Sequence, residues 1–226
     1  MKNKVKATEK ELFYDKFSSR WASKINNAET QKRLKIVFQK LLKSYNLKGK
    51  KFLEVGCGLG YFSEMANKLD ADVTGVDVGE SLVKITKKRV PRGKFVKASA
   101  SQLPFNSGTF DVVLCTEVIE HVENQNEALK ELSRVLKRNG ILVITTPNRL
   151  FKFLFDFLGI LGVRPYKGNE KWYYPWTLKK MLGSQGRIKN EVYFNFFFPS
   201  KYLDVFERFK FLRYLMINQG YLVKKI

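Results

Sequence analysis

The stretch FLEVGCGLG, residues 52–60, is an apolar strand that runs directly into three glycines spaced by two. A glycine turn at the carboxyl end of a strand lets a ligand approach bare backbone, and the helix that follows offers its N-terminus. A dinucleotide fingerprint would need a glycine at position 61, which is Tyr61 here, so the spacing disfavours a pyrophosphate ligand. The stretch therefore predicts a ligand site at a βα turn, but not one for NAD.

The next expected strand, DVTGVD at residues 72–77, ends in Asp77. At the tip of a neighbouring strand, the two oxygens of this carboxylate can accept hydrogen bonds from a ribose diol. Together, the glycine turn and Asp77 indicate a ligand that carries adenosine without a pyrophosphate. The alternative is a tight turn beside a solvated aspartate, with no ligand.

Outward from these two strands, short apolar strands alternate with amphipathic helices, which predicts an α/β fold with a parallel sheet covered on both faces. Before the core, Phe13, Phe17 and Trp21 mark one amphipathic helix, and an apolar stripe from Leu34 to Tyr45 marks a second. The expected strands lie at 51–56, 72–77, 94–98, 110–116, 141–146, 188–197 and 220–225. One expected helix follows the glycine turn and ends near residue 69, and the others lie at 80–89, 124–137, 177–184 and 200–214.

The charge of the chain is concentrated at its two ends. Among 226 residues, 42 are Lys or Arg and 21 are Asp or Glu, which gives a net charge of +21. Residues 1–50 and 149–226 each carry +10, whereas residues 51–148 carry +1. Such an excess favours an anionic partner, either a nucleic acid or a membrane surface.

The cysteines and the apolar runs of the chain limit the class of protein to which it can belong. Two cysteines, Cys57 and Cys115, show neither a disulfide framework nor paired metal-ligand spacing, so we expect a reducing, cytoplasmic compartment and no zinc site. The N-terminal residues contain no apolar signal region, and no charge-free apolar run is long enough for a bilayer span. We therefore expect a protein that is not integral to a membrane.

Several motifs in combination resemble the class I S-adenosylmethionine-dependent methyltransferases. The resemblance covers Leu53 to Pro147 and rests on the glycine turn and on the segments VTGVDVG, SASQLPF, FDVV, EVIEHV and RVLKRNG, residues 73–79, 99–105, 110–113, 117–122 and 134–140. It implies a doubly wound, Rossmann-like, seven-stranded and mostly parallel sheet with an antiparallel last strand. The implied cofactor is S-adenosylmethionine, with S-adenosylhomocysteine as its product.

The resemblance also implies where the cofactor lies. The turn of Gly56, Cys57, Gly58 and Gly60 would line it, with Gly56 and Gly58 at the methionine portion, while Glu54 would order the site near the ammonium group. Asp77 would hold the ribose hydroxyls, and Val78, Ser99, Ala100 and Thr116 would lie against the adenine or the methionine moiety. Many family members carry Asp where this chain has Ser99, and a serine oxygen is a weaker acceptor than a carboxylate.

The segment Glu117-Val-Ile-Glu120-His121 resembles the ubiquinone-biosynthesis O-methyltransferases, where it is associated with a divalent cation. His121 is the only histidine and is our candidate general base, although it could instead cap the segment structurally. Two carboxylates and an imidazole could hold Mg²⁺, but the same residues suit an ordinary junction between a loop and a helix, and we favour no tightly held metal. More loosely, the resemblance extends to Arg33, which would pair with the carboxylate of the cofactor or, alternatively, is a solvated helix charge.

We interpret residues 1–50 as an N-terminal helical cap and residues 51–148 as the cofactor-binding core. Residues 149–176 are then an insertion, and residues 177–226 supply the last strands of the sheet. Residues 150–163 are apolar nearly all round, with Lys152 and Asp156 as the charges before Arg164. Such a segment covers a hydrophobic acceptor, dips into an anionic membrane interface or packs in a homodimer. We prefer a lid at the membrane interface; the alternative is a lid that buries its own aromatic side chains.

The interpretation we favour is methyl transfer to a small, hydrophobic, hydroxylated acceptor such as a phenol, a quinol or a lipid-like molecule. A methyltransferase acting on RNA is the second hypothesis, because the flanks are basic and aromatic. Against it, the fifth strand ends Thr145-Thr-Pro147-Asn148, unlike the motif of enzymes that methylate base amino groups. A third hypothesis is a non-catalytic, basic binding subunit, which the intact glycine turn and Asp77 oppose.

Overall fold

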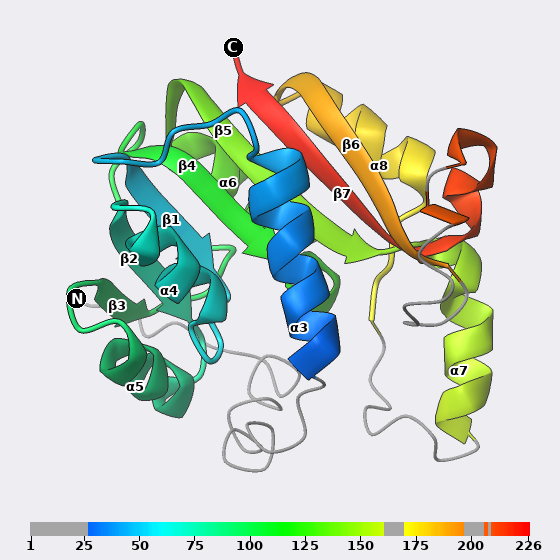
Figure 1. The fold of residues 1–226 in the computed structure, drawn as a ribbon, viewed down its shortest axis with the longest axis horizontal. Helices are drawn as coiled ribbons and strands as arrows, with labels where there is room; N and C mark the ends of the chain where they lie inside the picture. The colour runs from blue at the N-terminus through cyan, green and yellow to red at the C-terminus, as the bar shows by residue number, and fades with distance from the viewer. Residues whose placement is uncertain (1–26, 161–169, 197–205, 208) are drawn as a thin grey trace.

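A computed structural model describes residues 27–160, 170–196, 206–207 and 209–226. Seven strands form one sheet in the order β3-β2-β1-β4-β5-β7-β6 (Figure 1). Strands β1 to β5 are parallel, and β7 lies antiparallel between β5 and β6, which confirms the predicted fold class. The strand bounds are Lys51–Val55 for β1, Asp72–Asp77 for β2, Lys94–Lys97 for β3, Phe110–Thr116 for β4, Leu136–Pro147 for β5, Gly186–Phe196 for β6 and Met216–Lys225 for β7.

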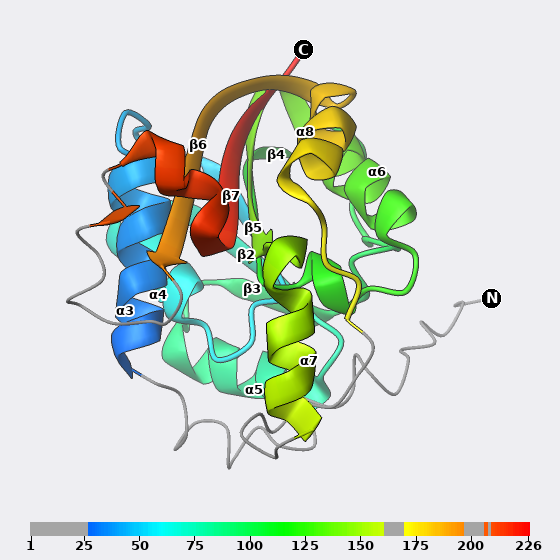
Figure 2. The same ribbon diagram turned by 90° about the vertical axis from the view of Figure 1, so that its right-hand side faces the viewer.

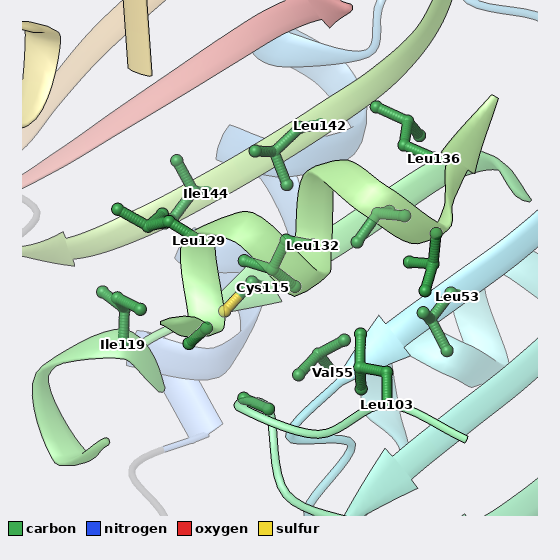
Figure 3. Packing of buried hydrophobic residues seen from close by; sticks show 14 of the residues in the cluster. Leu53, Val55, Leu103, Cys115, Ile119, Leu129, Leu132, Leu136, Leu142 and Ile144 are labelled. Carbon is green, nitrogen blue, oxygen red and sulfur yellow. The ribbon is translucent and has the colours of Figure 1, made fainter. Parts of the chain in front are cut away.

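Helices cover both faces of the sheet, as the alternation of strands and helices predicts. One face packs against α3 (Asn27–Leu34) with its π-helical continuation Lys35–Leu41, α4 (Tyr61–Lys68) and α5 (Glu80–Arg89). The other face packs against α6 (Gln125–Val135) and α8 (Pro175–Gly183). Figure 3 shows this second layer, where Leu129 and Leu132 of α6 lie over Cys115, Leu142 and Ile144 of the sheet.

Several element bounds differ from those expected, and the largest difference is at β5, which begins at Leu136 rather than at 141. Helix α6 ends at Val135 rather than 137, because the backbone of Leu136 is already extended and pairs with Phe110 of β4. Strand β7 begins at Met216 rather than 220. The helix expected at 13–21 lies outside the described residues, as does part of the one expected at 200–214, where Lys210–Leu215 forms a 3-10 helix.

The insertion after β5 begins with a 3-10 turn, Arg149–Phe151, and continues as helix α7, Lys152–Ile160. One side of this apolar segment is packed and the other is exposed. Phe151, before the first turn of α7, and Phe155 pack with Trp172, whereas the side chains of Phe153 and Phe157 are 77% and 55% exposed. Positions 153 and 157 share one helix face because they are four residues apart. In the described residues, no helix has the length and apolar character needed to cross a bilayer.

Candidate functional site

The glycine turn after β1 has a backbone that only glycine adopts without strain. Gly56, Gly58 and Gly60 have φ angles of 77°, 50° and 80°. A Cβ atom at Gly56 would lie 2.2 Å from Cγ2 of Val118, and one at Gly60 would lie 2.7 Å from Cγ2 of Thr86, so these two glycines are required by packing. A Cβ atom at Gly58 would meet no atom within 4 Å, so at this position the turn faces open space.

Asp77 fixes this turn from the end of β2. Its Oδ2 accepts a hydrogen bond from the Gly58 N–H at 2.9 Å, and its Oδ1 accepts one from the Gly79 N–H at 2.9 Å. The hydroxyl of Thr86 donates to the Gly58 carbonyl at 2.7 Å from the opposite side. The Asp77 carboxylate therefore joins the end of β2 to the glycine turn.

Glu54 lies below the turn and is almost fully buried. The Ser63 hydroxyl, on α4, donates to Oε2 of Glu54 at 2.5 Å. Burial raises the pKa of Glu54 to about 8, and the hydrogen bond from Ser63 only partly offsets this effect. A cationic group bound beside Glu54 would restore its charged form, which fits the role that the sequence resemblance implies.

The remaining predicted cofactor residues follow the ends of the adjacent strands. Val78 is half-buried directly after Asp77, and Ser99 and Ala100 are buried just after β3, where the Ala98 N–H donates to the Asp77 carbonyl at 2.9 Å. The hydroxyls of Ser99 and Ser101 are 2.9 Å apart. Thr116 is the last residue of β4. The carboxyl ends of β3, β2, β1 and β4 therefore bring these residues to one edge of the sheet, where ligands of open α/β sheets bind.

Glu117 and Glu120 contact adjacent residues of β5. The Thr145 hydroxyl donates to Oε1 of Glu117 at 2.9 Å, and the Thr146 hydroxyl donates to Oε2 of Glu120 at 3.1 Å. Successive side chains of a strand point to opposite faces, so the two carboxylates lie on opposite sides of the sheet edge. Among the residues that the structure describes, no three His, Cys, Asp or Glu side chains are placed to hold a metal ion.

His121 lies on the Glu120 side of this edge, in the 3-10 turn Ile119–His121. Its Nε2 is 4.0 Å from Oε1 of Glu120, and its Nδ1 is 3.8 Å from Oε1 of Glu170. Glu170 also accepts a 2.6 Å hydrogen bond from the indole N–H of Trp172, next to the insertion. Burial first, and then the Glu117 carboxylate, hold the pKa of Glu120 well above its usual range. The imidazole is thus placed between two carboxyl groups.

On the Glu117 side, the structure assembles a polar cluster that the sequence does not reveal. We call it the α3 cradle: Glu29 and Arg33 of α3, Glu117 after β4, Asn195 of β6 and Asn218 of β7. The predicted cofactor residue Arg33 donates through Nε to Oε1 of Glu29 at 3.0 Å, and its NH2 nitrogen is 3.9 Å from Oε2 of Glu117. Figure 2 shows α3 and the carboxyl end of β6 side by side. Within the α3 cradle, Asn195 and Asn218 are brought together by the register of β6 with β7.

Part of this chain is similar in sequence to known proteins. Residues 53–144 match the model of the methyltransferase domain family. The ubiquinone biosynthesis O-methyltransferase of Coxiella burnetii is 36% identical over 132 residues, which are 56% of this chain and 55% of that protein. The protein of the same name from Pelagibacter ubique is 30% identical over 138 residues, 56% of this chain and 58% of that protein. The chain thus spans about half the length of these curated relatives.

The fold has counterparts among solved structures. The crystal structure of magnesium protoporphyrin IX methyltransferase from Synechocystis with bound SAH superposes with a TM-score of 0.71 at 18% identity, covering 96% of this chain and 98% of that one. At this level of identity the likeness concerns the fold.

Proposed function

Because residues 53–144 match the model of the methyltransferase domain family, we propose that the chain transfers a methyl group from S-adenosylmethionine to a small, hydrophobic, hydroxylated acceptor. One observation carries the cofactor assignment: Asp77 holds the Gly58 N–H, and above Gly58 no protein atom would contact an added Cβ. A turn that is pinned in place and bare on its outer side is suited to a ligand that packs on backbone.

The residues at this edge fit the parts of S-adenosylmethionine. Asp77 is the type of group that accepts hydrogen bonds from ribose hydroxyls, Glu54 would stabilise the ammonium group, and Val78, Ser99 and Ala100 would flank the adenine. When bound, the sulfonium supplies the methyl group, and displacement at its carbon needs the acceptor in line and water excluded. The protein's contribution is then chiefly alignment, together with a group that takes the proton of an acceptor hydroxyl.

His121 is our candidate for that proton acceptor. Its Nδ1 lies 3.8 Å from Oε1 of Glu170, and this carboxylate would stabilise the imidazolium that forms when the ring accepts a proton. No metal ion is needed for this step, and we do not favour one. The names of the relatives in ubiquinone biosynthesis support an oxygen nucleophile on an apolar acceptor.

The exposed side chains on and beside α7 are suited to contact with a partner surface, in addition to the methyl acceptor. Leu150, Phe153 and Phe157 are exposed, Trp176 is exposed nearby, and the Arg149 guanidinium lies 5.2 Å from the ring of Tyr174, which stacks on Trp176. Aromatic side chains beside basic ones are typical of segments that bind anionic lipid surfaces. We propose that this face contacts an anionic membrane from which a lipid-like acceptor reaches the site, rather than a second copy of the chain.

A matched set of glycine variants tests the cofactor site. Gly58, Gly49 and Gly108 all have positive φ angles, and a Cβ at any of them would meet no protein atom within 4 Å. Each change to Ala therefore carries a similar backbone cost of about 1 kcal/mol, but only Gly58→Ala places a methyl where the ligand would lie. We expect calorimetric titration with S-adenosylhomocysteine to show at least a tenfold loss for Gly58→Ala and no loss for the other two.

The acceptor is tested with S-adenosylmethionine carrying a labelled methyl group, offered with alkylphenols, quinols or RNA. Label in phenols or quinols that depends on the Gly58 turn supports the proposal. Label in RNA instead would favour the nucleic-acid alternative. No binding of S-adenosylhomocysteine by the wild-type chain would refute the enzyme assignment and favour a non-catalytic basic subunit.

A further inference from the structure

The α3 cradle is a connected chain of hydrogen bonds whose directions are determined by its ends. The Asn195 amide nitrogen donates to Oε1 of Glu29 at 3.0 Å and to Oδ1 of Asn218 at 2.9 Å, and the Asn218 amide nitrogen donates to Oε2 of Glu117 at 3.0 Å. Ionised carboxylates only accept, so both asparagine amides must point their nitrogens this way. The orientation of each oxygen in the cradle follows from this.

Two buried oxygens in the cradle accept no hydrogen bond within the described part of the chain: Oδ1 of Asn195 and Oε2 of Glu29. Asn195 is 1% exposed and is held in the left-handed region, at φ 64°, which asparagine tolerates better than most residues. A buried acceptor without a donor costs about 1–3 kcal/mol. Both atoms belong to groups that are otherwise saturated, so each needs a donor from outside the cradle.

The cradle adjoins the proposed cofactor turn. Glu117 directly follows Thr116, and its backbone is held at φ 53° with its N–H on the Thr145 carbonyl at 2.9 Å. The next residue, Val118, packs against Gly56 of the glycine turn. A molecule in the cradle would therefore lie on the Glu117 side of the same sheet edge. The cradle contains two carboxyl groups, of Glu29 and Glu117, and one guanidinium group, of Arg33, and this excess of acceptors over donors disfavours an anion.

We propose that the α3 cradle binds the hydrogen-bond-donating end of the methyl acceptor, an O–H or N–H group, with Glu29 and Asn195 as the residues that select for a donor. This inference rests on the proposed methyl transfer. Asn218 is then a positioning residue, because it joins the donor-selecting pair to Glu117. A fully methylated product has lost its donor, so the same pair would discriminate product from substrate.

Glu29→Gln tests the donor selection without a change of shape. Asn195 and Arg33 both donate to Oε1 of Glu29, so the glutamine would keep its carbonyl oxygen there and place its NH₂ group where Oε2 now lies. One acceptor becomes a donor. Glu191→Gln is the matched control: Glu191, on β6, is likewise a carboxylate paired with basic side chains, Lys179 and Arg213, but it lies outside the cradle.

The probes are 4-butylphenol against 4-butylanisole, and phenethylamine against its N-trimethylated form, measured by ligand-observed NMR with the full chain and S-adenosylhomocysteine. We expect the wild type and Glu191→Gln to prefer one donor probe over its donor-free partner by at least tenfold, and Glu29→Gln to lose or reverse that preference. Which pair responds distinguishes a hydroxyl from an amine.

Equal binding of donor and donor-free probes by the wild type would overturn the proposal, and so would an unchanged preference in Glu29→Gln. The wild-type comparison keeps the test valid even if the variant does not fold. Binding of S-adenosylhomocysteine is scored separately by calorimetry. A donor preference without S-adenosylhomocysteine binding would refute the proposed methyl transfer while leaving a donor-selective site.

Discussion

Replacement of Asp77 by Asn removes an acceptor without removing volume. Each oxygen of Asp77 accepts one backbone N–H, from Gly58 and from Gly79. The asparagine keeps one carbonyl oxygen and turns the other position into a donor that faces an N–H group. One charge-assisted hydrogen bond is lost and one buried N–H is left unpaired, at a cost of about 2–3 kcal/mol to the free energy of unfolding.

Two measurements follow from this estimate. For a chain of this size, each kcal/mol lowers Tm by about 2–4 °C, so we expect Tm to fall by about 4–12 °C in thermal unfolding followed by circular dichroism. The ribose hydroxyls would also lose a charged acceptor, so calorimetry should show roughly a 10- to 150-fold loss of affinity for S-adenosylhomocysteine.

Asp72→Asn is the control, because Asp72 begins the same strand, is exposed and lies at the opposite edge of the sheet. We expect it to change neither Tm nor affinity. If Asp77→Asn behaved like Asp72→Asn in both measurements, the argument that this carboxylate organises the turn would be wrong. A fall in Tm with unchanged affinity would retain its structural role and refute its contact with the cofactor.

Three further predictions concern other parts of the molecule. Burial raises the pKa of Glu54 from 4.5 to about 8, so the folded state binds this proton more tightly than the unfolded state. The free energy of unfolding should therefore fall as pH rises from 4.5 to 8, by at most about 1.4 kcal/mol per pH unit. Urea unfolding at several pH values should show that Glu54→Gln removes this slope. Gly56→Ala should destabilise the fold by about 2–4 kcal/mol, because its Cβ would meet Val118 at 2.2 Å in a left-handed backbone, and adding Val118→Ala should recover part of the loss in the same assay. In co-sedimentation with anionic liposomes, Phe153→Ser should weaken binding and leave Tm unchanged, whereas Phe151→Ala, which removes a buried side chain, should lower the stability by about 3–5 kcal/mol.

The glycine turn and Asp77 were predictable because each of these residues lies at a fixed offset from a strand. Glycines spaced by two after an apolar run, and an acid at the end of the next run, are local patterns, and parallel strands bring their carboxyl ends to one edge. The structure accordingly joins Gly58 to Asp77 by a hydrogen bond between residues that are only 19 positions apart.

The α3 cradle was not predictable for the opposite reason. Glu29 and Asn195 are 166 positions apart, and Asn218 reaches Glu117 across 101 positions. Their meeting depends on the register of β6 with β7, which contains a shift between Ile188 and Asn190. No periodicity in the sequence reports such a shift. The early end of α6 at Val135 was missed similarly, because the pairing of Leu136 with Phe110 overrides its helical propensity.

The position of β7 also determines the order in which a chain emerging from the ribosome can complete its sheet. Strand β6 pairs with the sheet only through β7, although β7 is synthesised after it. A nascent chain that has emerged only as far as β6 can form the parallel half with its glycine turn, but β6 still has no neighbour to pair with. At that stage the hydrogen bond from Asn195 to Asn218 of β7 cannot form. The contribution of β6 and β7 to the α3 cradle is thus the last part of the sheet to form.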